Sequence, residues 1–204
     1  MMITVQQQGT DENRMPWEAR VVGVVWGIGG IAAVLVYAAI NLGRFAQEAM
    51  AAGLEPAEWL VLVVNTAVMA WAEGYRGFQQ RFSPRVAARA LNLYLHPTVL
   101  RLMLAPLFCA GYFGATVRLR RAVWIGTVLI LLAVLFFNQL PQPWRGILDA
   151  GVLVGLVWGT TALMVMGWAT FRERREIVSA EVPAPLPTQA PTPVRVGISR
   201  RAGL

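Results

Sequence analysis

Two groups of polar residues lie within or beside the apolar runs of this chain and have types that could do chemistry. Glu73 follows the run that contains Asn65, and Arg76 comes three positions later. A carboxylate at membrane depth can bind a proton or a cation, because burying an ionisable group in lipid is costly and usually serves a purpose. The same carboxylate can instead form an ion pair with Arg76 or with Arg101 of the next apolar segment. Both interpretations stay open.

Arg145 and Asp149 form the second group, four residues apart at the start of the last apolar run. That spacing places both on one helical face, where they can form an ion pair at the membrane surface. The chain has one histidine, His96, and one cysteine, Cys109, so a metal or haem site would need other ligand types or a second subunit. No nucleophile with a base is found. We therefore expect no enzyme, no cofactor and no metal site.

The elements that position these residues are long apolar helices. Apolar residues make up 56% of the chain and charged residues 14%, with a mean hydropathy of +0.52. Val21–Gly43, Ala122–Trp144 and Ala150–Phe171 contain no charged residue, and each has about the 20 residues that cross a bilayer. A glycine pattern at residues 27–32 resembles a dinucleotide-binding motif, but it lies inside an apolar run. The sequence therefore predicts an all-α integral membrane protein.

The number of crossings depends on the third of five apolar segments, which lie at about 21–43, 56–79, 98–117, 122–140 and 146–171. Pro106 interrupts the third segment and Arg101 lies near its start. If all five segments cross, eight of the arginines near the membrane lie on one side and seven on the other. If the third segment does not cross, thirteen lie on one side and only Arg44 and Arg145 on the other, which is the bias that the positive-inside rule expects. We expect a four-crossing helical bundle with a fifth, Pro-interrupted, membrane-embedded or re-entrant segment. Five crossings are the alternative.

Polar segments flank the membrane domain, which we place at residues 19–176. Residues 1–18 form a polar tail, and residues 177–204 contain five closely spaced prolines, a composition typical of a disordered tail. Between the second and third segments, polar residues recur at spacings of four and three over residues 84–96. With Ser83 as N-cap and Pro84 at the first position, this pattern predicts an amphipathic helix in the headgroup plane.

Basic residues near this helix are expected to form a collar that contacts anionic lipid or an acidic partner on the cytoplasmic side. Its members are Arg81, Arg85, Arg89, His96, Arg118, Arg120 and Arg121. No nucleic-acid partner is expected.

Glycines at intervals of four predict close contacts between membrane helices. Gly23 and Gly27 lie in the first apolar segment, and Gly151, Gly155 and Gly159 lie in the last. We expect the two stripes to face each other within one chain, with a homodimer seam as the alternative.

The glycine stripes, the basic collar and the proline-rich tail are surfaces suited to contacts with other molecules, and the sequence indicates no convergent polar pocket. These features favour a non-enzymatic accessory or assembly component of a membrane complex. The alternative is a small transporter, channel or lipid-handling protein that uses Asn65, Glu73 and Arg101. All 18 basic residues are arginine, which suggests a GC-rich genome. We accordingly expect a multi-pass protein of a bacterial inner membrane with both termini in the cytoplasm.

Overall fold

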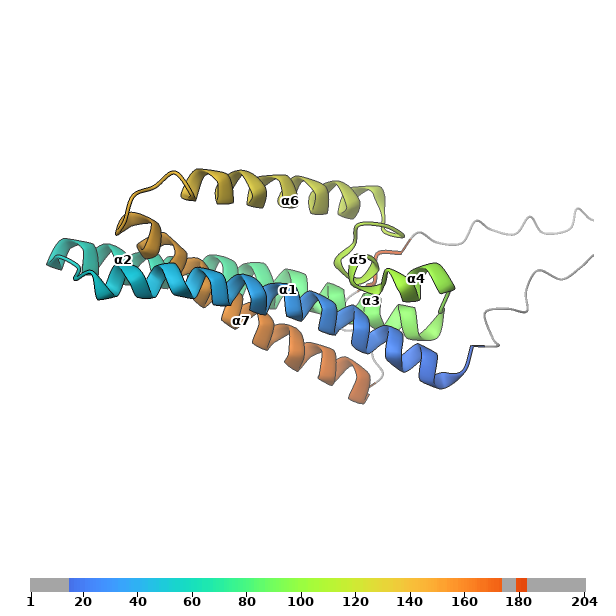
Figure 1. Cartoon of the computed structure of the whole chain (residues 1–204). Coiled ribbons are helices and arrows are strands. Elements are labelled where there is room, and N and C mark those ends of the chain that lie inside the picture. The colour runs from blue at the N-terminus through green and yellow to red at the C-terminus, as the bar shows by residue number, and fades with distance from the viewer. Residues whose placement is uncertain (1–14, 174–178, 183–204) are drawn as a thin grey trace, which may run out of the picture.

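The described residues of the computed structural model, 15–173 and 179–182, form helices and no strand, which confirms the all-helical class (Figure 1). In chain order the elements are α1 (Trp17–Ala51), α2 (Pro56–Met69), η1 (Ala70–Phe82), α3 (Ser83–Leu95), α4 (Val99–Met103), α5 (Ala105–Ala110), α6 (Val117–Phe137) and α7 (Trp144–Glu173). Three of these helices, α1, α6 and α7, are long and apolar enough to cross a membrane. Most of the two expected tails lies outside the described residues.

The helices α2, η1 and α3 follow one another without a break. Pro56 opens α2 in a capping box between Glu55 and Glu58, in which the Glu55 N–H donates to Glu58 Oε2 at 2.9 Å. The middle element, η1, is a π-helix with hydrogen bonds five residues apart. Ser83 has helical dihedral angles, φ −59° and ψ −43°, and caps nothing. The expectation of a separate helix that starts at Ser83 is therefore wrong.

The burial of α3 also differs from that of a helix on the membrane surface. Nine of its 13 residues are buried, because α3 packs against α1, α5 and α7. It ends at Leu95, where the His96-Pro97 pair stops helical hydrogen bonding. Residues 84–96 thus belong to the bundle.

The first and last long helices, α1 and α7, share the largest contact between any two elements and run in opposite directions. Gly167 of α7 lies against Ile28, Leu153 lies against Gly43, and Gly146 lies against Ala49. Small residues at both ends of the contact allow the two backbones to approach closely.

The segment at 98–117 consists of two short helices, α4 and α5, and a loop. Thr98 caps α4 by accepting a hydrogen bond from the Arg101 N–H at 3.4 Å, and Pro106 lies in the first turn of α5. Gly111 ends α5 with a φ of +96°, a left-handed conformation that favours glycine. The loop then leads to Thr116, which caps α6.

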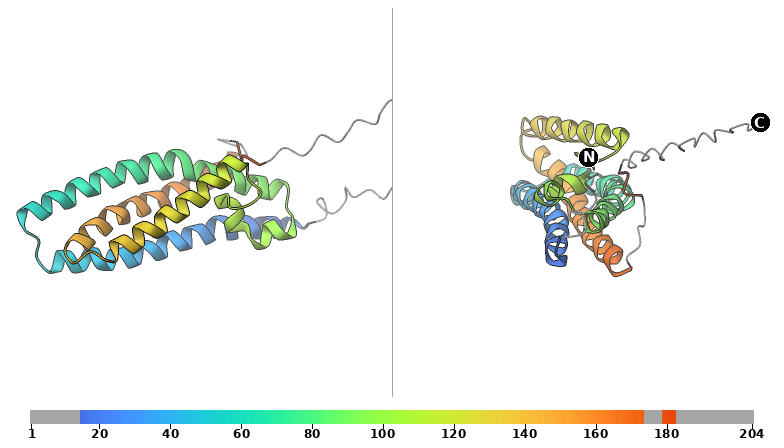
Figure 2. Two further views of the ribbon diagram at one scale, coloured as in Figure 1. Left: turned by 90° about the horizontal axis from the view of Figure 1, so that it is seen from above. Right: turned by 90° about the vertical axis from the view of Figure 1, so that its right-hand side faces the viewer.

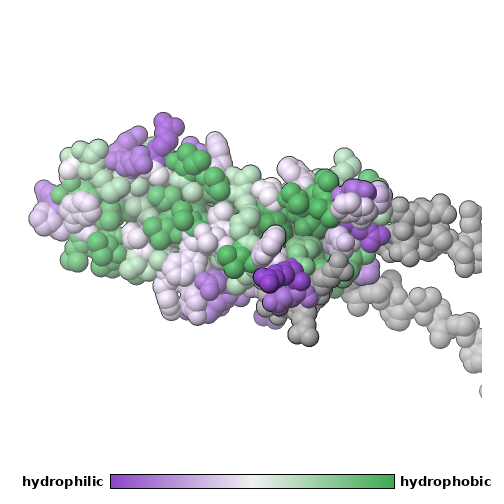
Figure 3. All heavy atoms as spheres, turned by 90° about the horizontal axis from the view of Figure 1, so that it is seen from below, coloured by the Kyte–Doolittle hydropathy of each residue, from purple (hydrophilic) through white to green (hydrophobic). Residues whose placement is uncertain are grey.

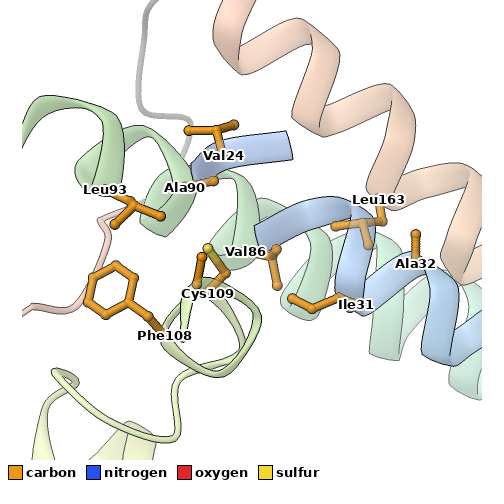
Figure 4. Packing of buried hydrophobic residues seen from close by; sticks show 10 residues of the cluster. Val24, Ile31, Ala32, Val86, Ala90, Leu93, Phe108, Cys109 and Leu163 are labelled. Carbon is orange, nitrogen blue, oxygen red and sulfur yellow. The ribbon is translucent and has the colours of Figure 1, made fainter. Parts of the chain in front are cut away.

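A single cluster of buried apolar side chains joins α1, α3, α5 and α7 (Figure 4). Phe108 and Cys109 of α5 enter it from one side, and Leu163 of α7 from another. The other members come from α1 and α3: Val24, Ile31, Ala32, Val86, Ala90 and Leu93, together with Ala105 of α5. The core thus lies toward the end of the bundle where α1 begins and α3 ends.

In contrast, α6 stands apart from the bundle, as Figures 1 and 2 show. Only 6% of its most apolar stretch is buried. The loop before it provides its main attachment, where the Tyr112 hydroxyl lies 2.7 Å from Thr127 Oγ1 and the Tyr112 ring packs edge-on against Trp124. On the face in Figure 3, which looks at the molecule from below, apolar residues cover much of the surface and hydrophilic residues gather in separate patches. Such a surface suits a membrane protein.

Candidate functional site

A column of polar side chains on α2 and η1 faces α7, and we call this contact the polar seam. It comprises Asn65, Glu73 and Gln79 on one side and Gly151, Gly155 and Trp158 on the other. At its start, Asn65 Nδ2 donates a hydrogen bond of 2.9 Å to the Ile147 carbonyl oxygen. At its far end, Trp158 Nε1 donates to Gln79 Oε1 at 2.7 Å. Glu73 lies between these two hydrogen bonds along the helix.

Glycines of α7 provide the room for this seam. A Cβ added at Gly155 would lie 3.1 Å from both the Cβ and Oε2 of Glu73, and one at Gly151 would collide with the Asn65 amide. Gly159 continues the row against the Phe78 ring. The α7 glycines therefore allow α2 and η1 to bring polar groups against the α7 backbone.

The predicted contact between the two glycine stripes is wrong. The α7 stripe faces α2 and η1, whereas Gly23 and Gly27 of α1 face Leu102 of α4 and Cys109 of α5. The reason is that α4 and α5 fold back against the first half of α1, while α1 meets α7 through other residues. Both stripes are used inside the chain.

Glu73 has no hydrogen bond and no ion pair to any residue that the structure describes. Arg76 turns away, with its guanidinium 5.0 Å from the centre of the Trp71 ring. Arg101 lies in α4, where it donates to the His96 carbonyl oxygen at 3.3 Å and stands 5.1 Å from the Phe108 ring. The expected pairing of Glu73 with either arginine is therefore absent from the described part of the chain.

The hydrogen bond between Gln79 and Trp158 is not predicted by the sequence pattern. The signal that could have indicated it is chemical, because a tryptophan N–H within a membrane helix needs an acceptor and Gln79 is a polar residue near the end of the second apolar segment. Sequence spacing alone does not connect residues so far apart in the chain.

Arg145 and Asp149 lie together at the start of α7. Arg145 Nε is 3.7 Å from Asp149 Oδ2, and the Asp149 side chain is only 4% exposed. The Arg145 guanidinium also stacks 3.6 Å from the centre of the Phe45 ring of α1. The pair thus joins the start of α7 to α1 and leaves Asp149 with a partner, unlike Glu73.

A second polar centre surrounds Arg89 of α3, and we call it the arginine node. The Arg89 side chain is 1% exposed and donates hydrogen bonds to four carbonyl oxygens. Their residues come from α5, from the loop after it and from the segment after α7: Phe108 at 2.7 Å, Phe113 at 2.9 Å, Gly114 at 3.2 Å and Ala180 at 3.0 Å. Its guanidinium also stacks 4.4 Å from the Phe108 ring. Arg89 therefore ties three separate segments together.

Arg89 is consequently not accessible to lipid, and its assignment to the basic collar is wrong. Burial is the main cause that lowers the pKa of Arg89 to about 10, so the side chain stays positively charged at neutral pH. Residues 179–182, assigned to a disordered tail, include Ala180 in this node and Glu181, whose carbonyl oxygen accepts from the Thr116 N–H at 2.9 Å. The remainder of that tail lies outside the described residues.

The other members of the collar remain accessible. Five are exposed, and Arg85 is half-buried with its Nε donating to the Arg81 carbonyl oxygen at 2.6 Å. The exposed members are Arg81, His96, Arg118, Arg120 and Arg121. Contact of these residues with anionic lipid or an acidic partner on the cytoplasmic side remains a prediction.

Comparison of the chain with family models, with curated proteins and with solved structures gave no match.

Proposed function

We propose that this protein is a non-enzymatic accessory or assembly component of a membrane protein complex, and that α6 is the helix that binds its partner. The observation that carries this proposal is the isolation of α6. Ten consecutive or nearly consecutive large side chains between Trp124 and Phe136 are exposed, around the whole circumference of the helix. A helix that is apolar all round is stable only in lipid or against other apolar helices.

Glycine usage favours a partner helix over lipid alone. Of the glycines in α1, α6 and α7, only Gly29 and Gly126 would have no atom within 4 Å of an added Cβ. The others lie in close contacts within the chain. Glycine lowers helix stability by about 1 kcal/mol relative to alanine, and apart from Gly29 and Gly126 these three helices place it where another element packs against it. Gly126 on α6 is thus the position where we expect the partner helix to pack.

Four crossings suit this arrangement. The crossing helices are α1, α2 with η1, α6 and α7, while α4 and α5 have five and six residues and reach only about 8 and 9 Å. The start of α1 and the end of α7 lie toward the same end of the molecule (Figure 1). The positive-inside rule then places thirteen arginines in the cytoplasm with both termini, leaving Arg44 and Arg145 outside. A bacterial inner membrane fits this orientation.

Photo-crosslinking in native membranes tests the role of α6. A photoreactive residue at Leu129 or Leu132 of α6 should give one discrete adduct with another protein, whereas the same residue at Val165 of α7 should label lipid. All three native side chains are exposed, which makes Val165 a matched control. Gly126→Leu should abolish the α6 adduct by blocking close approach. Lipid labelling alone at both α6 positions would overturn the proposal.

The second candidate, a small transporter, channel or lipid-handling protein, needs Asn65, Glu73 and Arg101 to act together. Arg101 contacts His96 and Phe108 and does not join the polar seam. What supports this candidate is therefore Glu73 alone, as an unpaired carboxyl group beside α7.

A further inference from the structure

Glu73 contacts α7 within the charge-free stretch of that helix. Its carboxyl group packs against Gly155, which follows Asp149 by six residues and precedes Arg172 by seventeen. At 1.5 Å per residue these separations are about 9 Å and about 26 Å along the helix axis. The carboxyl group therefore lies among apolar segments and away from both charged ends of α7.

No positive charge faces Glu73 from the described elements packed around it. On η1 itself, Arg76 stacks on Trp71, and Arg81 is exposed. On α7, Arg145 pairs with Asp149. On α3, which also packs against η1, Arg85 donates to the Arg81 carbonyl oxygen and Arg89 donates to the carbonyl oxygens of the arginine node. The acids of α2, Glu55 and Glu58, belong to the capping box at the helix start, far from Glu73 along the chain. An ionised carboxylate at Glu73 would thus lose its hydration without gaining a partner, at a high cost in free energy.

Two kinds of ligand could remove this cost, namely a metal ion or a proton. A metal ion such as Na⁺ or Ca²⁺ takes several oxygen ligands, and no group of three or more His, Cys, Asp or Glu side chains lies together among the described residues. Gln79 Oε1 already accepts from Trp158, and Asn65 donates through Nδ2 to Ile147, so within the seam only Asn65 Oδ1 could join the two oxygens of Glu73. A proton needs only the carboxylate itself.

We propose that Glu73 is a membrane-embedded proton-binding site and that the neutral carboxyl group is the form that packs against Gly155. Loss of the proton places an uncompensated charge against the α7 backbone. The contact between η1 and α7 is therefore the one that proton release weakens. This proposal does not depend on the role of α6, because the two sites share no residue.

A membrane-soluble carbodiimide tests the proposal on the full chain in native-lipid nanodiscs. The reagent reacts with a protonated carboxyl group: the acid proton moves to one reagent nitrogen, and the carboxyl oxygen bonds to the central carbon. The product rearranges to a stable N-acylurea with no other reactant. Mass spectrometry should locate the adduct at Glu73 at neutral pH. Labelling should fall about tenfold for each pH unit above the titration midpoint.

Three controls make the result specific. Glu73→Gln should remove the adduct, whereas Glu58→Gln should leave it unchanged because Glu58 lies at the exposed start of α2. A carboxyl C=O band in the infrared spectrum of the unlabelled protein should be present at neutral pH and lost in Glu73→Gln. This second measurement needs no reagent access to the seam. Absence of both the adduct and the band at neutral pH would overturn the proposal, as would labelling that does not change with pH.

Discussion

The arginine node and the polar seam each place an ionisable side chain between helices, Arg89 fully buried and Glu73 half-buried, but the surroundings of the two charges are opposite. The node gives Arg89 four carbonyl acceptors and the face of the Phe108 ring. The seam gives Glu73 no partner among the described residues. Charge in the node is compensated in one fixed geometry, whereas charge in the seam is uncompensated and can be removed by a proton.

This difference separates a structural role from a changeable one. Replacing a buried, fully hydrogen-bonded ion is costly in folding free energy, because each carbonyl oxygen that it served then lacks both water and a donor. Neutralising an unpaired carboxyl group costs the folded protein little, since the neutral form already suits its surroundings. The two centres should therefore respond oppositely to removal of charge.

The largest expected effect is at the node. Arg89→Met keeps the length of the apolar stem but leaves the carbonyl oxygens of Phe108, Phe113, Gly114 and Ala180 without their donor. The free energy of unfolding should fall by about 3–5 kcal/mol, which is the range for breaking a buried ionic network. Denaturant titration in detergent micelles measures this change.

Arg85→Met is the matched control, because Arg85 lies one helical turn earlier and is only half-buried. Its substitution should change the free energy of unfolding by less than about 1 kcal/mol. Equal effects of the two substitutions would remove the distinction between the node and an ordinary surface arginine.

The next effect is at the glycine row of the seam. Gly155→Leu places a branched side chain where Glu73 and the Met69 backbone already lie. Overpacking of this kind should lower the free energy of unfolding by about 1–3 kcal/mol. Gly126→Leu, in open space on α6, should leave the same quantity unchanged in the isolated protein. A similar loss from both substitutions would show that the measurement reports glycine replacement in general.

The sequence was sufficient for the parts of the fold that depend on hydropathy. Charge-free runs predicted the helical class and the three long apolar helices, because the cost of moving charge into lipid is a property of each segment by itself. The isolation of α6 could not be predicted in this way, since the apolar stretches of α6 and α7 have similar mean hydropathies, 2.0 and 1.8. Hydropathy distinguishes lipid from water and does not identify which helices are neighbours.

The candidate sites show the same limit. Arginines four apart on a helix are typical of a solvated face, and Arg89 is buried only because acceptors from residues 108–114 and 180 surround it. The glycine stripes indicate close approach but not the partner helix. Glu73 was identifiable, because a carboxylate at the end of an apolar run is unusual whatever surrounds it. Its lack of a partner required the three-dimensional structure.

A smaller effect is expected at the start of the seam. Asn65→Leu removes the hydrogen bond to the Ile147 carbonyl oxygen and should lower the free energy of unfolding by about 1 kcal/mol. Asn41→Leu is the matched control, since Asn41 donates only to Tyr37 of its own helix. Its effect should be smaller, because no contact between helices is lost. Equal effects would indicate that Asn65 does not hold α2 to α7.

The smallest effect on stability is expected at Glu73, although this residue carries a potential charge inside the membrane region. Glu73→Gln replaces a neutral carboxyl group with a neutral amide of the same shape. In acidic buffer, where the carboxyl group is protonated in both the folded and the unfolded state, the free energy of unfolding should therefore change by less than about 0.5 kcal/mol. The pH dependence should differ more. If the folded state holds a proton that the unfolded state releases, the stability of the wild-type protein decreases as the pH rises above the ordinary glutamate pKa of about 4.3, and Glu73→Gln should lose less. At neutral pH, Glu73→Gln should consequently be more stable than the wild-type protein. A large destabilisation of Glu73→Gln at neutral pH would instead mean that the seam requires the charge, as the node does.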